Sequence, residues 1–348
     1  MSLINLFKRK NRKVLFTTPS HSQNFSVLNK FRRFYKYDIS ETDAHNPQVA
    51  LSLAEKWAAT IYGVKYTKFL TNGSSSGVIA AVLAAVKKGD KVLIWDKAHP
   101  CHLNAVKLAG AEPVFYQLPY NSEWGVYGRF DANVLEQVVQ NGRIAAVIVT
   151  SPSYEGIVSD VSAIAQICRK NNVKLIVDEA HGALYPFSDK LPQSSVGIAD
   201  FTVQSLHKTA GGLNPTALLH SIDIDTSLAL SMINTTSPSY ALLMSIEANI
   251  RFLSSARGRK ALTQLLKNLE SLRCDCSDIE FYGDDLTKII IKKDGVSGFK
   301  LSEILFENFN IEDERSNEKS TMLLTGIGTT SKKLLFLRDA LKKINTHL

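Results

Sequence analysis

The sequence predicts an α/β protein whose large domain contains a mostly parallel sheet and is followed by a smaller α+β C-terminal domain. Short apolar runs alternate with stretches of helical periodicity up to about residue 222, a pattern typical of strand and helix units in a parallel sheet. After that point a long helical stretch and a polar, charge-rich stretch precede further strands and helices. The chain has 348 residues and 45% hydrophobic content, enough for two cores. We expect an N-terminal arm at residues 1–45, a large domain at 46–222, and a helix linker with a small domain at 223–348.

Charge and composition exclude several classes of protein. The net charge is +8, but the basic residues are scattered except at residues 8–13 and 32–33, so we expect no nucleic-acid partner. A minor role of the basic arm towards an acidic partner remains open. No apolar run reaches the roughly 20 residues of a membrane span, and the N-terminal charge order is the reverse of a secretory signal. We therefore expect a cytoplasmic protein. We also expect no metal site, since the four cysteines fit neither a disulfide framework nor zinc spacing.

The first elements of the large domain surround a candidate anion site. Apolar residues recur at helical spacing over residues 47–62, and Gly63 is typical of a C-cap. Small and hydroxylated residues at 71–77, among them Gly73, Ser74 and Ser75, then precede an alanine-rich helix reaching residue 88. The free N–H groups and dipole at such a helix start favour an anion, and a phosphate is the expected guest. A simple serine N-cap is the alternative.

The following elements continue the alternation of strands and helices. We predict strands at residues 91–95, 113–117 and 144–149, and helices at 131–140 and 160–170. The exit loop of the first strand carries His99 and His102. Ligands bind beyond the carboxyl ends of strands in such sheets, where this loop and the loop at 151–156 would lie.

Two further strand ends carry the central candidate residues. The apolar run at 174–177 ends in Asp178, and the run at 201–203 leads to Lys208. A lysine amine can form a Schiff base with pyridoxal phosphate, and a facing carboxylate can keep the pyridine nitrogen protonated. A strand-end carboxylate and a solvated surface lysine are the structural alternatives when each residue is taken alone.

The motifs around these residues carry a resemblance to a known family. Residues 178–183, 187–192 and 204–209 read DEAHGA, FSDKLP and QSLHKT. In order and density they resemble the pyridoxal phosphate core of the ornithine/lysine/arginine decarboxylase family of fold type I, over roughly residues 60 to 245. The resemblance implies the fold type I pyridoxal phosphate-dependent transferase fold, with pyridoxal 5′-phosphate in the large domain.

The resemblance also implies roles for individual residues. It makes Lys208, His99 and Asp178 catalytic, with His99 rather than His102 stacked over the pyridine ring. The alternative that both histidines only decorate a helix entrance remains open for His102. The implied cofactor contacts are Gly73, Ser74, Ser75, His99, Asp178, Ala180, His181, Ser205, His207, Lys208 and Ser237.

Ser237 lies in a segment, residues 235–240, that resembles one reaching the phosphate of the neighbouring subunit's cofactor. The resemblance therefore implies a homodimer with shared active sites. Residues 18–21 resemble a Pro-Gly-His segment that lines the site, with Ser20 in place of glycine. A surface histidine in a turn is the alternative for His21.

The implied reaction is decarboxylation of an amino acid substrate, expected to be a basic one, to the amine and carbon dioxide. Alternatives are an aminotransferase or lyase reaction on the same fold, or a pyridoxal phosphate-binding protein without turnover. Aminotransferases hold the substrate carboxylate with an arginine, and residues 325–328 carry none. Arg251, Arg257 and Arg315 remain candidates for that role. Against the family pattern we expect a short form, without a regulatory wing domain ahead of the core and without the far C-terminal extension.

Overall fold

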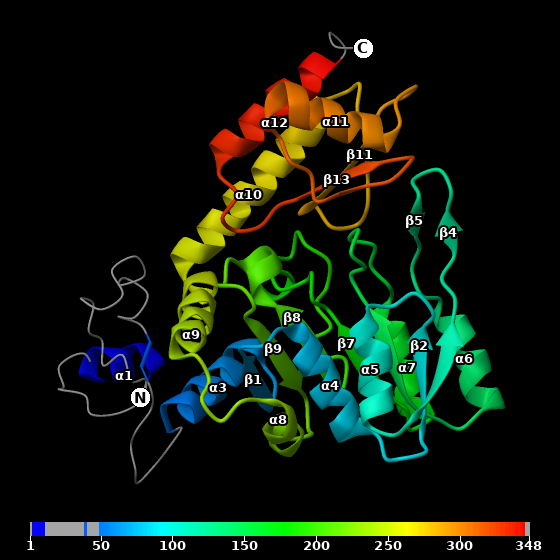
Figure 1. Ribbon diagram of the computed structural model, residues 1–348, viewed down its shortest axis with the longest axis vertical. Coiled ribbons are helices and arrows are strands. Elements are labelled where there is room, and N and C mark those ends of the chain that lie inside the picture. The colour runs from blue at the N-terminus through cyan, green and yellow to red at the C-terminus, as the bar shows by residue number, and fades with distance from the viewer. Residues whose placement is uncertain (1, 11–37, 40–48, 345–348) are drawn as a thin grey trace.

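The computed structural model describes residues 2–10, 38–39 and 49–344. His21, Arg32 and Arg33 therefore lie outside the described residues. The described residues form two lobes, which Figure 1 shows one above the other. We refer to the lobe around the parallel sheet as the large lobe and to the other as the small lobe.

The large lobe is built on one central sheet. Its strand order, within the described ranges, is β1–β9–β8–β7–β6–β2–β3. The strands are β1 (Tyr66–Leu70), β2 (Lys91–Trp95), β3 (Glu112–Tyr116), β6 (Ile144–Thr150), β7 (Lys174–Asp178), β8 (Phe201–Ser205) and β9 (Ala217–Ser221). β9 pairs antiparallel with both neighbours, whereas the pairs from β8 to β3 are parallel. The prediction of a mostly parallel sheet is confirmed.

Helices cover both faces of this sheet, which explains its near-continuous apolar strands. In β2, Val92 and Ile94 pack in a cluster with α4 (Ser74–Ala85) and α5 (Pro100–Leu108), while Leu93 packs in a second cluster with α6 (Ala132–Asn141) and α7 (Val161–Lys170). A strand buried on both faces needs apolar residues at successive positions. The helices of the large lobe are α1 (Leu3–Lys10), α3 (Val49–Tyr62), α4 (Ser74–Ala85), α5 (Pro100–Leu108), α6 (Ala132–Asn141), α7 (Val161–Lys170), α8 (Ser227–Ile233) and α9 (Tyr240–Ser254).

The small lobe packs helices on an antiparallel sheet of order β10–β11–β13–β12. Its elements are α10 (Ala256–Asp275), β10 (Glu280–Tyr282), β11 (Lys288–Lys292), α11 (Gly298–Phe309), β12 (Arg315–Ser316), β13 (Thr321–Leu324) and α12 (Ser331–Lys343). The charge-rich stretch whose structure the sequence left open is the helix α10. Its apolar residues Leu262, Leu265, Leu266 and Leu269 are buried, and its polar residues face outward.

A hairpin of the large lobe reaches across to the small lobe. Its strands are β4 (Tyr120–Asn121) and β5 (Val126–Tyr127), which stand upright in Figure 1. Trp124 at its tip stacks on Tyr282 with ring centroids 4.9 Å apart and packs against Ile290 and Met322. The hairpin therefore closes one side of the space between the lobes.

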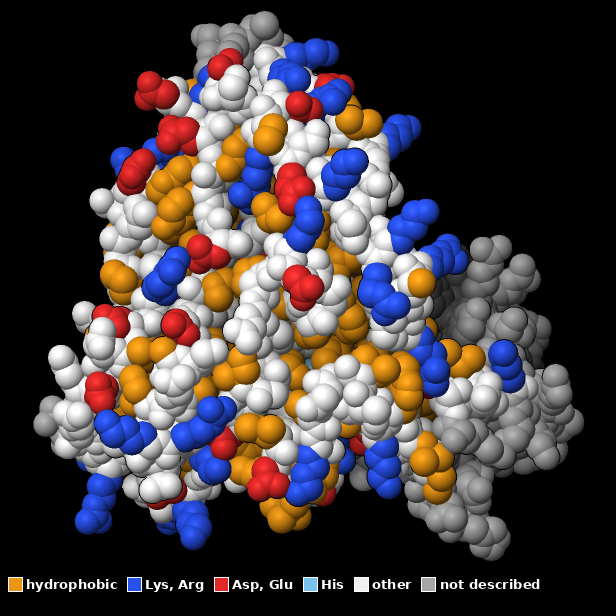
Figure 2. Space-filling view, turned by 180° about the vertical axis from the view of Figure 1, so that it is seen from behind, with side chains coloured by type: hydrophobic (Ala, Val, Ile, Leu, Met, Phe, Trp, Pro, Cys, Tyr) orange, Lys and Arg blue, Asp and Glu red, His pale blue; other side chains and the backbone are white. Residues whose placement is uncertain are grey.

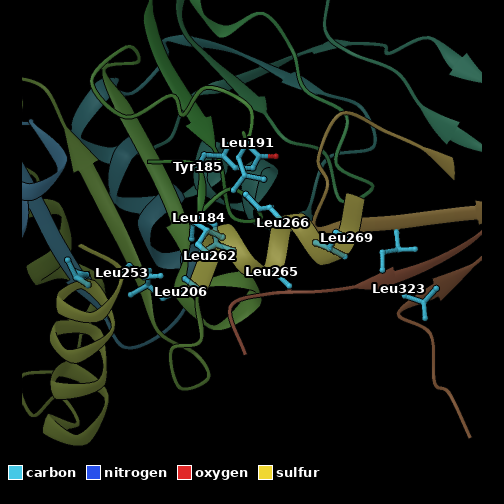
Figure 3. Packing of buried hydrophobic residues seen from close by; sticks show 14 of the residues in the cluster. Leu184, Tyr185, Leu191, Leu206, Leu253, Leu262, Leu265, Leu266, Leu269 and Leu323 are labelled. Atoms are coloured by element: carbon cyan, nitrogen blue, oxygen red, sulfur yellow. The ribbon is translucent and has the colours of Figure 1, made fainter. Parts of the chain in front are cut away.

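A shared apolar core holds the lobes together on the other side. Figure 3 shows Leu184, Tyr185 and Leu206 of the large lobe beside the leucines of α10, with Leu323 of β13 in the same cluster. The loop after β13 also contacts the large lobe directly, because Ile327 N–H donates to the Thr209 carbonyl at 2.9 Å. A Cβ on Gly326 would lie 2.4 Å from that carbonyl oxygen, so only glycine allows this approach. The segment next to Lys208 is thus pressed against the small lobe.

Charged side chains are spread over the surface, as they are along the sequence. On the face shown in Figure 2, Lys and Arg side chains are interspersed with Asp and Glu rather than gathered in one patch. Among the described helices, none combines the length and apolar character needed to cross a bilayer.

Candidate active site

A cavity of about 670 Å³ opens at the carboxyl edge of the central sheet, between the two lobes. Nine of the sequence-predicted residues line it, namely Gly73, Ser74, Ser75, His99, Asp178, Ala180, His181, His207 and Lys208. They come from segments up to 135 residues apart in sequence, and the fold brings them to one place. Arg315 of β12 contributes to the same wall from the small lobe.

Asp178 is the last residue of β7 and is buried at the base of the cavity. Its Oδ2 lies 2.9 Å from Nε2 of His102, and its Oδ1 accepts from Ala180 N–H at 3.1 Å. Burial alone would raise the pKa of Asp178, but the hydrogen bond from His102, together with the charge of Lys208, holds it below its ordinary value. The carboxylate is therefore ionised.

His102 itself is fully buried on α5. Its Nδ1 has no hydrogen-bond partner among the described residues, so the ring proton belongs on Nε2, facing Asp178. The alternative that His102 only decorates a helix entrance is wrong, because this imidazole orients the carboxylate.

Lys208 lies on a single π-helical turn, Leu206–Ala210, directly after β8. β7 and β8 are adjacent and parallel, so Lys208 and Asp178 meet at neighbouring strand ends as predicted. Gly211 closes the turn with φ 84°, a left-handed conformation that glycine adopts without strain. Burial lowers the pKa of the Lys208 amine, opposed by the nearby Asp178 carboxylate. Its Nζ lies 3.1 Å from Nε2 of His181.

The start of α4 forms another part of the cavity wall. The N-cap residue is Gly73, with φ 85°, and among the described residues no side chain caps this helix end. Ser76 instead donates its hydroxyl to Asn72 Oδ1 at 2.6 Å. The simple serine N-cap is therefore wrong, because no side chain of the described residues caps α4, whose first residues Ser74 and Ser75 line the cavity.

Two histidines flank the cavity with defined ring orientations. His99 is the N-cap of α5, and its Nδ1 accepts from Cys101 N–H at 3.3 Å, which leaves the ring proton on Nε2. Burial lowers the pKa of His99, opposed by Asp178. His207 Nδ1 lies 3.0 Å from the Thr216 carbonyl oxygen and so donates to it. Within the described part of the chain, no hydrogen bond engages its Nε2, and the residue lines the cavity.

Two predicted contacts do not line this cavity. Ser205 is fully buried at the end of β8, and its hydroxyl has no hydrogen-bond partner among the described residues. Ser237 is exposed in the loop between α8 and α9, with its hydroxyl 3.2 Å from that of Thr235.

The rim of the cavity carries both signs of charge. Glu155 accepts from Arg315 Nη1 at 3.0 Å, and Tyr154 donates its hydroxyl to Glu314. Among the described residues that line the cavity, Arg315 is the one candidate arginine. Arg251 pairs instead with the buried Glu247 at 2.8 Å on α9.

Sequence reasoning left the role of His102 open and missed Lys288. His102 contacts a carboxylate 76 positions away, and Lys288 of β11 places its Nζ 3.0 Å from Nδ1 of His181, 107 positions away. Lysine is almost never fully buried without a partner, but only the structure shows that Lys288 of the run Lys288–Lys292 is buried, so the sequence alone carries no signal for it.

Comparison with known proteins identifies the family. The family described as Orn/Lys/Arg decarboxylase, major domain, matches residues 10–290. An arginine decarboxylase of Bacillus subtilis is 29% identical over 364 residues, covering 95% of this chain and 74% of that protein. The solved lysine decarboxylase LdcF of Francisella novicida has a TM-score of 0.86 at 20% identity, covering 99% of this chain but 60% of that one. This chain thus spans less than two thirds of that solved protein.

Fold neighbours outside this group include a structure of SPT with PLP, at a TM-score of 0.66 and 14% identity, covering 84% of this chain and 76% of that one. These neighbours confirm the fold type I architecture, in which a mostly parallel sheet carries the site. The match over residues 10–290 covers well over half of the sequence. The chain belongs to the Orn/Lys/Arg decarboxylase family.

Proposed function

We propose that this chain uses pyridoxal 5′-phosphate to decarboxylate an amino acid with a basic side chain, giving the corresponding amine and carbon dioxide. The observation that carries the proposal is the meeting of Lys208 and Asp178 in one cavity with the start of α4. The site roles given below are part of the same proposal.

The residues present fit this cofactor. The uncapped start of α4 offers N–H groups at Ser74 and Ser75 for a phosphate, with His207 beside them. The unpaired buried hydroxyl of Ser205 supports its role as a further donor. Asp178 is an ionised carboxylate suited to a protonated ring nitrogen, and the small side chain of Ala180 and the imidazole of His99 line the same cavity, where a flat ring would lie.

The mechanism follows from what each side chain can do. The bound cofactor supplies an electron-accepting ring that takes up the electron pair left when carbon dioxide departs. Asp178, oriented by His102, keeps the proton on the ring nitrogen. Lys208 Nζ is the amine that would hold the cofactor through its carbonyl carbon and that would give up this place to the substrate amine. Lys208 Nζ or His99 Nε2 then delivers a proton to the substrate's α-carbon.

A carboxylate in the cavity wall supports a basic substrate. Glu155 lines the cavity and accepts from Arg315, and Glu314 accepts from Tyr154 beside it, while Arg315 and Lys97 are cations of the same wall. A cationic substrate group can take the place of Arg315 beside Glu155. We therefore infer that a lysine, ornithine or arginine side chain extends towards this rim.

We further propose a homodimer in which Ser237 reaches the phosphate of the neighbouring subunit's cofactor. Ser237 is exposed and lies outside the cavity of its own chain. The adjacent helix α8 exposes two large apolar side chains, Leu228 at 71% and Met232 at 66%. Apolar surface of this kind beside a proposed shared residue supports a subunit contact.

The proposed domain division follows the two sheets. The large pyridoxal phosphate-binding domain covers residues 46–222 and the linker with the small domain covers 223–348. The central sheet ends at Ser221 and the second sheet begins at Glu280. Between them α8 and α9, which the proposed linker contains, pack on the large lobe, and α10 leads into the small lobe.

Aminotransferase chemistry is the second candidate, because Arg315 is placed where a substrate carboxylate could be held. The reaction products distinguish aminotransfer from decarboxylation. We expect borohydride treatment of the protein with pyridoxal phosphate to leave a pyridoxyl group on the Lys208 peptide, seen by mass spectrometry. Incubation with lysine, ornithine or arginine should then yield an amine. A keto acid would support aminotransfer, and label on Lys208 without any product would support a protein without turnover.

A further inference from the structure

Two contacts join the lobes in the cavity wall, and they involve neighbouring residues on each side. Arg315 donates from Nη1 to Oε1 of Glu155 at 3.0 Å, and Tyr154 donates its hydroxyl to Glu314. The Arg315 guanidinium also lies over the Tyr154 ring, with its central carbon 5.7 Å from the ring centroid. The loop after β6 carries Tyr154 and Glu155, whereas Glu314 and Arg315 lie at the start of β12 in the small lobe. We refer to these four residues as the interlobe latch.

The loop that carries Glu155 is held by several contacts. Ser153 Oγ accepts from the N–H groups of Glu155 and Ile157, at 3.2 and 3.3 Å, and donates to Glu155 Oε2 at 3.2 Å. Ser153 N–H in turn donates to the Ile157 carbonyl at 2.8 Å. Gly156 has φ 83°, and a Cβ there would lie 2.6 Å from Lys288 Cγ, so the loop packs directly on the small lobe. One oxygen of the Glu155 carboxylate is thus fixed by its own loop, and the other faces Arg315.

Arg315 is held by fewer contacts than Glu155. It lies on β12, which has two residues and is the edge strand of its sheet within the described ranges. Its side chain is 59% exposed, against 15% for Glu155, and in the described part of the chain its one ion pair is with Glu155. The pair can therefore open by rotation of the arginine side chain, which leaves a fixed carboxylate in the cavity wall.

Once the pair opens, Glu155 needs another cation. A largely buried carboxylate is costly without a partner. The two lysines of the cavity wall are engaged elsewhere, because Lys97 Nζ lies 5.0 Å from the centre of the Tyr127 ring and Lys208 Nζ lies 3.1 Å from His181 Nε2. A ligand that opens the pair must therefore bring its own positive charge to Glu155. A neutral or anionic side chain cannot do so.

We propose that Arg315 is a specificity-determining residue, which occupies the Glu155 carboxylate as a built-in competitor until the side-chain cation of the substrate displaces it. An ammonium or guanidinium group of the substrate exchanges for the Arg315 guanidinium, so Glu155 keeps one cation beside it throughout. Amino acids without such a group leave the pair closed. The inference rests on the proposed function for the class of ligand, an amino acid with a basic side chain, and adds that competition within the cavity wall selects it.

Propylguanidinium tests this exchange without any reaction, because it carries the cation of an arginine side chain but no aliphatic amine and no carboxylate. Its binding to the full chain with pyridoxal phosphate is measured by NMR titration at about 0.15 M salt, where the Debye length is about 8 Å. We expect Arg315→Met to bind it about threefold more tightly than the native chain, since a half-exposed ion pair is a weak competitor. We expect Glu155→Gln to bind it about tenfold more weakly, because a charge-assisted hydrogen bond is lost. The neutral isostere propylurea should bind the native chain more weakly than propylguanidinium.

Two control variants separate competition from a general effect of charge. Lys97→Met removes a positive charge from the same cavity wall but leaves the Glu155–Arg315 pair intact, so the affinity for propylguanidinium should stay at the native value. In the Glu155→Gln background, Arg315→Met should add nothing, because the carboxylate for which the two cations compete is absent.

Three results would overturn the proposal: unchanged or weaker binding in Arg315→Met that is folded by circular dichroism, an equal gain in Lys97→Met, or an equal gain in the Glu155→Gln background. None of these titrations depends on decarboxylation. A chain that shows the exchange but releases no carbon dioxide from an amino acid would therefore reject the proposed function and leave the role of Arg315 standing.

Discussion

The contact between His102 and Asp178 links a helix N-terminus to a strand end. Asp178 follows directly from an apolar strand read in the sequence, and Lys208 follows from the next one. Their pairing could be predicted because parallel strands end at one edge. The partner of Asp178 could not, because nothing in residues 96–102 tells which of the two imidazoles turns inward. His99 caps the helix at its start, and His102 faces the core three residues later.

We predict that His102→Leu weakens pyridoxal phosphate binding about tenfold, since loss of a hydrogen bond to a buried charge costs about 1–3 kcal/mol. It also raises the pKa of Asp178. The stabilisation by this carboxylate exists above its unfolded-state pKa and is lost as pH falls through its folded-state pKa. The acid limb of the activity profile should therefore move to higher pH. Absorbance titration of the cofactor and rates against pH measure both effects, and His102→Gln, which keeps a donor, should restore most of the loss.

The buried charge of Lys288 should lower the free energy of unfolding. Its pKa is lowered to about 8 in the folded chain, so below that value the folded state bears the cost of a buried charge. We predict that Lys288→Met raises the free energy of unfolding at pH 7 by roughly 3 kcal/mol, an order-of-magnitude figure from the shift. The gain should shrink as pH rises from 8 towards the unfolded-state value of about 10.4. Urea unfolding at several pH values measures it; a loss of stability at pH 7 would contradict the assigned environment of Lys288.

Among the helices and strands, those with strong hydrophobic periodicity could be predicted from the sequence, and the short paired strands could not. The helix predicted at residues 47–62 is α3, Val49–Tyr62, and the strand predicted at 91–95 is β2. The strand β1 was missed because its five residues run directly into the loop before α4. The hairpin β4–β5 has two residues in each strand and depends on contacts of Trp124 with the small lobe, which no local pattern encodes.

The start of α4 can be tested as a phosphate site distinct from an ordinary helix cap. We predict that Ser74→Asp stabilises the chain without cofactor by about 0.3–1 kcal/mol, because a negative charge suits the helix N-terminus. The same charge should weaken pyridoxal phosphate binding at least about tenfold by repelling the phosphate. Thermal unfolding and cofactor titration give the two quantities. The neutral Ser74→Asn is the matched control, and equal cofactor affinity in both variants would place the phosphate elsewhere.

At the scale of the whole molecule, two lobes form one site. The large lobe supplies Asp178 and Lys208, and the small lobe supplies Lys288 and Arg315. The resemblance in the sequence covered roughly residues 60 to 245 and so named residues of the large lobe and the linker. The contributions of the small lobe depend on packing around Leu206 and α10, which brings distant segments together. Tertiary contacts of this kind carry no local sequence signal.

The proposed dimer makes a quantitative prediction. Lys208→Ala and Ser237→Glu should each be inactive alone if each site needs Lys208 from one subunit and Ser237 from the other. Mixed and refolded in equal amounts, half of the dimers are hybrids, and each hybrid has one site with both native residues. We therefore expect activity to recover to about a quarter of the native value. Absence of recovery, with hybrid dimers shown by native mass spectrometry, would contradict sharing through Ser237.

Release of labelled carbon dioxide tests the proposed decarboxylation directly. Purified chain with pyridoxal phosphate is incubated with lysine, ornithine or arginine carrying ¹³C in the α-carboxylate, and the headspace is measured by mass spectrometry. We predict labelled carbon dioxide from at least one of the three, in equal amount to the amine formed, and none from Lys208→Ala. If the native chain binds the cofactor on Lys208 and the label stays in a keto acid or in unreacted substrate, the decarboxylation claim is wrong.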